Sequence, residues 1–268
     1  MTLDVDNRKR ITIFAGVNVL AEARMNHAVA ETLVEACNRN NLNLVFKASF
    51  DKANRTSLSS YRGPGLVEGL KALESIKTSF GLPIVTDVHD VNQIEAVAAV
   101  CDVIQIPAFL SRQTDLLCEA ATVGLPILVK KMQMMSPLDA LRVVDKLRAL
   151  GADKVYLCER GTSFGYQNLV VDFLGMLEMI NSETPLIFDV SHALQQPGAL
   201  GGSSGGRREY LMPFARAGLS LGIAGLFFEC HPDPDRALCD GQCALSLDKV
   251  PEFIGEISRF DQVIKAQC

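Results

Sequence analysis

Residues 84–130 read IVTDVHDVNQIEAVAAVCDVIQIPAFLSRQTDLLCEAATVGLPILVK. Three short, β-branched apolar runs in this stretch, at 84–87, 103–106 and 127–130, are separated by two longer stretches with the apolar spacing of a helix. Strands joined by crossover helices pair in parallel, because each helix returns the chain to the same end of the sheet. The stretch therefore predicts an α/β fold with a parallel sheet.

The same alternation continues in both directions along the chain. We expect strands at 11–16, 44–48, 84–87, 103–106, 127–130, 154–158, 186–190 and 224–229. We expect helices near 23–38, 65–80, 91–100, 113–122, 137–150, 169–180, 206–221 and 247–260. Eight units in 268 residues predict a single (β/α)8 TIM barrel, residues 1–268, with a short N-terminal extension. The alternative is an open doubly wound sheet, but no Gly-x-Gly-x-x-Gly follows the first strand.

The charge and the apolar runs exclude several classes of partner. The formal net charge is −5 and the sequence pI is about 5.4, so no net basic field would attract nucleic acid or an anionic membrane. The longest largely apolar run, 217–228, is too short to span a bilayer, and residues 1–10 do not begin a signal peptide. We therefore predict a cytoplasmic protein without a nucleic-acid or membrane partner, whose eight cysteines are mostly small core residues.

An anion would have to bind to a local cluster of cations in such an acidic chain. The run 47–57, KASFDKANRTS, contains three cations with hydroxyl and amide groups, which are the groups that hold phosphate. A solvated charged loop would have the same composition. Further cations, Arg112, Lys130 and Arg160, follow later strands. The strands of a barrel end at one mouth, so these cations predict a site for two phosphorylated small molecules.

The residues at this mouth also allow two other kinds of site, a Schiff-base lysine and a metal site. Only one of Lys130 and Lys131 can face the barrel axis, because side chains alternate along a strand. A buried lysine there could instead form the Schiff base of an aldolase. The residues His192, Glu229 and Asp240 could bind a divalent metal with one more ligand, and a competing zinc cluster would use Cys230, Cys239, Cys243 and His231, although their spacing matches no common zinc pattern.

Seven motifs, taken together and in order, closely resemble the 3-deoxy-D-manno-octulosonate 8-phosphate synthase family over nearly the whole chain. They are KASFDKANR (47–55), YRGPG (61–65), TDVH (86–89), QIPAFLSRQTD (105–115), RGTSFGY (160–166), FDVSH (188–192) and HPDPD (231–235). The family has the (β/α)8 fold. The resemblance implies a transferase that condenses phosphoenolpyruvate with D-arabinose 5-phosphate and water, for lipopolysaccharide biosynthesis.

The resemblance also implies roles for individual residues. Phosphoenolpyruvate would be held by Lys47, Ser49, Lys52, Gln105, Lys130 and Arg160. Arabinose 5-phosphate would be held by Asn54, Arg55, Thr56 and Ser57, with Arg112 reaching the sugar phosphate of a neighbouring subunit in a homotetramer. The catalytic set would be Asn18, Lys52, His192, Glu229 and Asp240, which orient water and the aldehyde oxygen or shuttle protons.

One position bears on the cofactor that the resemblance implies. Family members that need a divalent metal carry cysteine where this chain has Asn18, and the others carry asparagine. A neutral amide is a poor replacement for a thiolate ligand. We therefore expect a metal-independent enzyme without any cofactor.

Two further functions remain as alternatives. One is a related phosphoenolpyruvate-condensing synthase, such as the seven-carbon enzyme of the aromatic pathway, although the Asn-Arg-Thr-Ser run at 54–57 argues against it. The other is a paralogue that binds phosphorylated ligands without turnover, because the first loop, 16–22, departs from the family pattern.

Overall fold

Eight parallel strands close into a barrel in the computed structural model, which describes residues 3–55, 57–165, 167–199 and 204–267. The barrel strands are β1 (Thr12–Val19), β2 (Asn43–Ser49), β3 (Ile84–Asp87), β4 (Val103–Ile106), β5 (Ile127–Lys130), β6 (Val155–Glu159), β9 (Leu186–Asp189) and β12 (Gly225–His231). They follow one another around the sheet in that order, and β12 pairs with β1 to close it. The predicted (β/α)8 TIM barrel is confirmed, and the doubly wound alternative is wrong.

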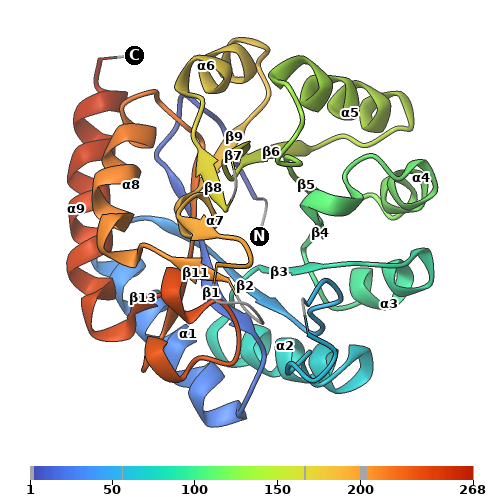
Figure 1. Ribbon diagram of the computed structural model, residues 1–268, viewed down its shortest axis with the longest axis vertical. Helices are drawn as coiled ribbons and strands as arrows, with labels where there is room; N and C mark the ends of the chain where they lie inside the picture. Colours follow the sequence, from blue (N-terminus) through green and yellow to red (C-terminus); the bar gives the residue numbers. More distant parts are fainter. Residues whose placement is uncertain (1–2, 56, 166, 200–203, 268) are drawn as a thin grey trace.

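Helices surround the barrel on its outer face (Figure 1). They are α1 (Ala23–Arg39), α2 (Leu66–Phe80), α3 (Ile94–Ala98), α4 (Thr114–Thr122), α5 (Pro137–Ala149), α6 (Phe173–Asn181), α8 (Leu211–Leu219) and α9 (Val250–Lys265). The short α7 (Val190–Ala193) instead follows β9 directly and lies at the end of the barrel (Figure 1). The start of α5 shows how sequence sets a boundary: the Ser136 hydroxyl accepts a hydrogen bond from the Asp139 amide, and Pro137 takes the first helical position. No helix among the described residues is long and apolar enough to cross a membrane.

Side chains alternate along the strands and form two apolar layers. One fills the barrel interior and includes Phe14, Val45, Tyr156 and Phe227. The other lies between the strands and the helices. Val5 of the N-terminal extension is buried with the interior layer, so the extension helps to fill the barrel on the side of the strands' amino ends.

Several predicted boundaries are wrong because residues in the loops pair with one another. The predicted helix 169–180 begins only at Phe173, since β7 (Thr162–Gly165) and β8 (Asn168–Val170) form an antiparallel hairpin. The Asp172 side chain accepts from the Gly175 amide and so begins α6. The predicted helix 206–221 is shortened to α8, because β11 (Gly205–Gly206) pairs with β10 (Gln195–Gln196). A further short strand, β13 (Leu245–Ser246), pairs with β12.

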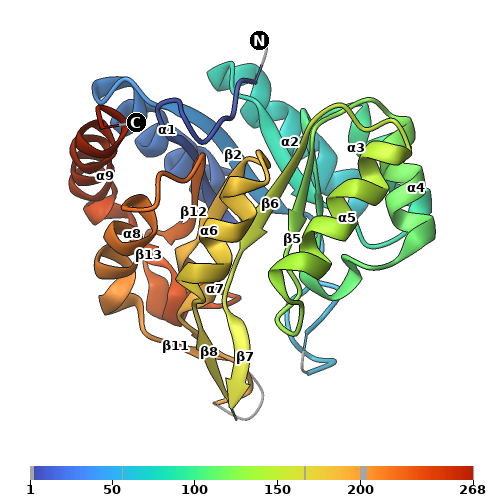
Figure 2. The same cartoon turned by 90° about the horizontal axis from the view of Figure 1, so that it is seen from above.

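The first strand is longer than predicted, and this places Asn18 inside it rather than in the following loop. The pairing of β1 with β2 shifts register between Gly16 and Val19. Glycine is required at position 16, because a Cβ there would collide with the carbonyl oxygen of Lys47. The hairpin of β7 and β8 projects from the end of the barrel opposite the N-terminus (Figure 2), which is the end where the strands finish.

Candidate active site

A cavity of about 450 Å³ opens at the carboxyl ends of the barrel strands. Nine of the predicted site residues line it: Lys47, Lys52, Asn54, Arg55, Gln105, Lys130, Arg160, His192 and Asp240. They come from six different strand ends or the loops that follow them. Five of the six cations predicted to converge on one mouth, Lys47, Lys52, Arg55, Lys130 and Arg160, therefore do so, whereas Arg112 does not line the cavity.

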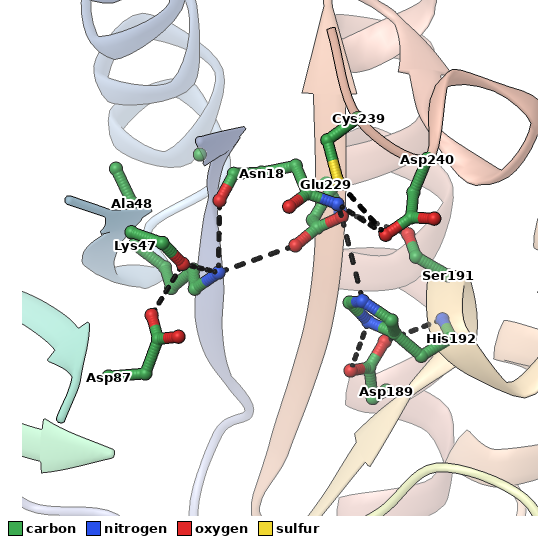
Figure 3. Close-up of polar contacts among 12 residues, drawn as sticks. Asn18, Lys47, Ala48, Asp87, Asp189, Ser191, His192, Glu229, Cys239 and Asp240 are labelled. Carbon is green, nitrogen blue, oxygen red and sulfur yellow. Dashed lines mark hydrogen bonds and ion pairs between the residues drawn. The ribbon is translucent and has the colours of Figure 1, made fainter. Parts of the chain in front are cut away.

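Lys47 lies at the floor of the cavity and is almost completely buried. Its ammonium Nζ lies 3.0 Å from Ser49 Oγ. It also lies 3.3 Å from the backbone oxygen of Asn18 and 3.4 Å from Glu229 Oε1 (Figure 3). Burial lowers the pKa of this lysine, and the neighbouring charge of Lys52 lowers it further. Ser49, Asn18 and Glu229 do not line the cavity themselves, but they fix the cation that does.

Buried carboxylates balance these cations. Burial alone would lower the pKa of Lys52, but the charges of Asp87 and Glu229 outweigh this effect. Burial alone would raise the pKa of Asp87, but the charges of Lys47 and Lys52 outweigh it. The pKa of Lys52 is therefore raised and that of Asp87 lies well below its usual value. Asp87 also accepts from the Ser49 hydroxyl and lies 3.1 Å from His89 Nε2. The floor of the cavity thus holds fixed charges of both signs at neutral pH.

Asp189, at the end of β9, holds two of the predicted residues in place. Its Oδ2 lies 2.5 Å from Lys130 Nζ and 2.7 Å from His192 Nδ1, and its Oδ1 accepts from the His192 amide at 2.9 Å. Burial alone would raise the pKa of the Asp189 carboxyl, but His192 and Lys130 lower it. Because Nδ1 of His192 is occupied by Asp189, Nε2 is the nitrogen that faces Glu229, 3.9 Å from Oε2.

Asn18, Glu229 and Asp240 form the third cluster. The Asn18 amide donates to Glu229 Oε2 at 2.6 Å and to Asp240 Oδ2 at 3.1 Å. Gln195 links this cluster to Arg160: it donates to Asp240 Oδ1 and accepts from the Arg160 guanidinium, both at 3.0 Å. Burial alone would raise the pKa of the Asp240 carboxyl, but the nearby His192 and Lys52 hold it below its usual value.

Neither of the two metal alternatives has a complete ligand set among the residues that the structure describes. Within the described ranges, no three His, Cys, Asp or Glu side chains are arranged to hold a metal ion. The Asn18 amide presents its N–H groups to Glu229 and Asp240, so at this point the chain offers a hydrogen-bond donor where a metal site needs an electron-pair donor. In the zinc alternative, the thiols of Cys230 and Cys243 contact backbone oxygens of Gly16 and Gly205 instead.

The residues expected to hold the sugar phosphate lie at the outer part of the site. Arg55 contacts the Cys239 thiol and donates to the backbone oxygen of Leu238 at 3.2 Å. Ser57, whose hydroxyl contacts Ser59, and the exposed Arg112 do not line the cavity of this chain. Thr56 lies outside the described residues.

The alternation argument for the two adjacent lysines is confirmed. Lys130 faces the cavity, whereas Lys131 points to the outer side, where its Nζ lies 3.0 Å from Thr162 Oγ1 and 3.3 Å from Glu159 Oε2. Glu159 therefore also faces away from the cavity, although it directly precedes Arg160.

Two residues that line the cavity, Gln195 and Phe227, were not predicted from the sequence, and Cys239, which also lines it, was placed only in the alternative zinc cluster. Alternation could have found Phe227, which lies two residues before Glu229 on β12 and so shares its face. The contacts of Gln195 have no comparable signal, because they depend on the pairing of β10 with β11.

The fold and this cavity define a class of protein: a (β/α)8 barrel whose strand ends form a cationic site. Residues 5–266 match the profile of the DAHP synthetase I family, and the chain belongs to that family. Within it, the chain is 49% identical to the 2-dehydro-3-deoxyphosphooctonate aldolase of Shewanella baltica (strain OS155 / ATCC BAA-1091), over 99% of this chain and 94% of that protein. It is also 49% identical to the protein of the same name from Pseudomonas fluorescens (strain SBW25), over 98% of this chain and 94% of that protein.

Proposed function

We propose that this chain condenses phosphoenolpyruvate with D-arabinose 5-phosphate and water, giving 3-deoxy-D-manno-octulosonate 8-phosphate and inorganic phosphate. The observation that carries the proposal is that Lys47, Lys52, Arg55, Lys130 and Arg160 line one cavity together. Two phosphorylated substrates need such a set of cations, and the names of the relatives support this substrate class. Lipopolysaccharide biosynthesis would consume the eight-carbon product.

The cavity has two ends, and we assign one substrate to each. Phosphoenolpyruvate would lie on the inner group, Lys47, Ser49, Lys52, Gln105, Lys130 and Arg160. In this group, Lys47 and Lys130 pair with the buried carboxylates Glu229 and Asp189. Arabinose 5-phosphate would bind to Asn54, Arg55, Thr56 and Ser57, of which Asn54 and Arg55 line the cavity. Arg112 is exposed beyond the cavity, where it would complete the sugar-phosphate site of a second copy in a cytoplasmic homotetramer.

The reaction follows from this placement. The C3 carbon of phosphoenolpyruvate attacks the aldehyde carbon of the sugar, while water adds at C2, and the aldehyde oxygen gains a proton. The resulting hemiketal phosphate then breaks its C–O bond and releases phosphate, leaving the 2-keto group. Fixed cations stabilise the charge that develops without reorganising during the step.

Proton transfer would use the cluster on the other side of the cavity. His192 is held by Asp189 through Nδ1, and its Nε2 faces Glu229, so this pair can pass a proton to or from water. Asn18 and Gln195 fix the positions of Glu229 and Asp240 by hydrogen bonds. We propose that Asn18, Lys52, His192, Glu229 and Asp240 form the catalytic set.

We further propose that the enzyme needs no divalent metal. The support is the Asn18 amide, which donates hydrogen bonds to both Glu229 and Asp240 and so keeps these two carboxylates apart by an uncharged bridge. Turnover in the presence of excess chelator is the expected outcome. Activity that chelator abolishes and a divalent ion restores would contradict the proposal.

The deciding experiment measures phosphate release from phosphoenolpyruvate with different co-substrates. We expect release with arabinose 5-phosphate and little with erythrose 4-phosphate. A preference for erythrose 4-phosphate would favour the seven-carbon synthase instead. Binding of both substrates without phosphate release would identify a non-catalytic paralogue.

A further inference from the structure

Lys130 is held from two sides, by a carboxylate and by an aromatic ring. Its Nζ lies 2.5 Å from Asp189 Oδ2 and 3.1 Å from the centroid of the Phe227 ring. The ring belongs to β12, is completely buried and lines the cavity. Lys47 Nζ lies 5.7 Å from the same centroid. The negative face of one aromatic ring therefore lies within reach of two cations.

The buried ammonium group of Lys130 is only partly stabilised by a carboxylate. Lys130 is only 5% exposed, and an ammonium group taken out of water needs other groups to replace its hydration. Its one carboxylate partner, Asp189, is shared with His192. A second carboxylate would stabilise the cation but would repel an anionic substrate. The face of a neutral ring attracts the ammonium without adding a negative charge to the site.

We propose that Phe227 is a positioning residue for phosphoenolpyruvate, because its ring face holds the Lys130 ammonium in the place where it meets the anionic substrate. This inference rests on the proposed function, which assigns Lys130 to phosphoenolpyruvate. The proposed interaction is a cation–π contact, and its strength depends on the electron density of the ring and not only on the volume of the ring.

The next residue along β12 provides a matched control. Phe228 is equally buried but points to the outer side of the barrel, where its ring packs edge-on against Phe253 with centroids 5.1 Å apart. The two phenylalanines share strand, burial and size, and only Phe227 faces the cavity cations. A change that acts through packing alone should affect both positions similarly.

The test replaces Phe227 with mono-, di- and trifluorinated phenylalanine, which retain the shape of the ring while progressively weakening its negative face. We expect the KM for phosphoenolpyruvate to rise with each fluorine, reaching a total increase of about fivefold to thirtyfold. This range corresponds to ~1 to ~2 kcal/mol at about 1.4 kcal/mol per tenfold change. The KM for arabinose 5-phosphate and the melting temperature should stay near those of the parent protein. The same series at position 228 should leave both KM values unchanged.

A flat series at position 227, or equal effects at positions 227 and 228, would overturn the inference. The unmodified enzyme separates this failure from failure of the proposed function. If it releases phosphate from the two substrates while the series is flat, only the role of Phe227 is wrong. If the unmodified enzyme does not turn over these substrates, the proposed function itself fails, and the assignment of Lys130 to phosphoenolpyruvate fails with it.

Discussion

The Asp189→Asn substitution is the sharpest test of how the site is held together. Asparagine retains the size of the side chain but removes the charge that faces both Lys130 and His192. Asp189 is completely buried, so the lysine would lose its counter-ion where water does not replace it. Breaking a buried ion pair by removing one partner typically costs about 3–5 kcal/mol of unfolding free energy. We expect a loss of this size at pH 7.

The pH dependence of that loss follows from the lowered pKa of Asp189. Its pKa in the folded protein lies below the unfolded value of 3.8, so the carboxylate stabilises the fold above that value. This stabilisation is lost as the pH falls through and below 3.8, because protons then bind to the unfolded chain first. The difference in unfolding free energy between the parent protein and Asp189→Asn should therefore be largest at neutral pH and shrink in acid.

Urea unfolding across this pH range measures the difference directly. The exposed Asp145 of α5 provides the control: Asp145→Asn should change the unfolding free energy by less than about 0.5 kcal/mol at every pH. A difference for Asp189→Asn that does not vary with pH would refute the reasoning. So would a loss no greater than that of the control.

Three shorter predictions concern the chemistry of the cavity. Arg160→Ala should lower kcat/KM for phosphoenolpyruvate by at least about a hundredfold, because hydrogen bonds to charged groups contribute ~1.5–3 kcal/mol each and a phosphate can take two from arginine. The control Arg148→Ala, at an exposed position of α5, should leave this kcat/KM unchanged. Steady-state kinetics of the two variants test both expectations. Asn18→Cys should create metal binding, seen as stoichiometric zinc in the purified protein, while some turnover remains; a variant that binds no zinc would contradict the role given to this position. Borohydride with either substrate should label none of Lys47, Lys52, Lys130 and Lys131, and a reduced adduct found by mass spectrometry would favour the Schiff-base aldolase.

The barrel and most of the cavity could be predicted because they depend on local patterns. Apolar runs mark the strands, and polar residues at their ends mark the side of the barrel where Lys47, Lys130 and Arg160 meet. The strict alternation of side chains also predicted that only one of Lys130 and Lys131 faces the cavity, and the structure shows that it is Lys130. These signals need no knowledge of how the loops fold.

The errors arose where non-local pairing decides the structure. Nothing in residues 162–170 indicates an antiparallel hairpin in preference to a helix start, because its stability comes from the pairing of Thr162 with Val170 and of Ser163 with Leu169. Similarly, the register shift that turns Asn18 toward Glu229 depends on the close approach of Gly16 to the backbone of β2. The first-loop sequence that departs from the family pattern is thus partly a strand in this fold.

The carboxylates beneath the cavity explain how an acidic protein can hold anionic substrates. Lys47 pairs with Glu229 and Lys130 with Asp189, so these cations are balanced before any substrate arrives and do not depend on the net charge of the chain. Buried cations without partners would shed protons, because burial disfavours their charged forms. In each pair a buried carboxylate lies beside the ammonium group, and the lysine lines the cavity. The attraction for a phosphate then comes from the orientation of these ion pairs. The net charge of the chain does not reveal this orientation.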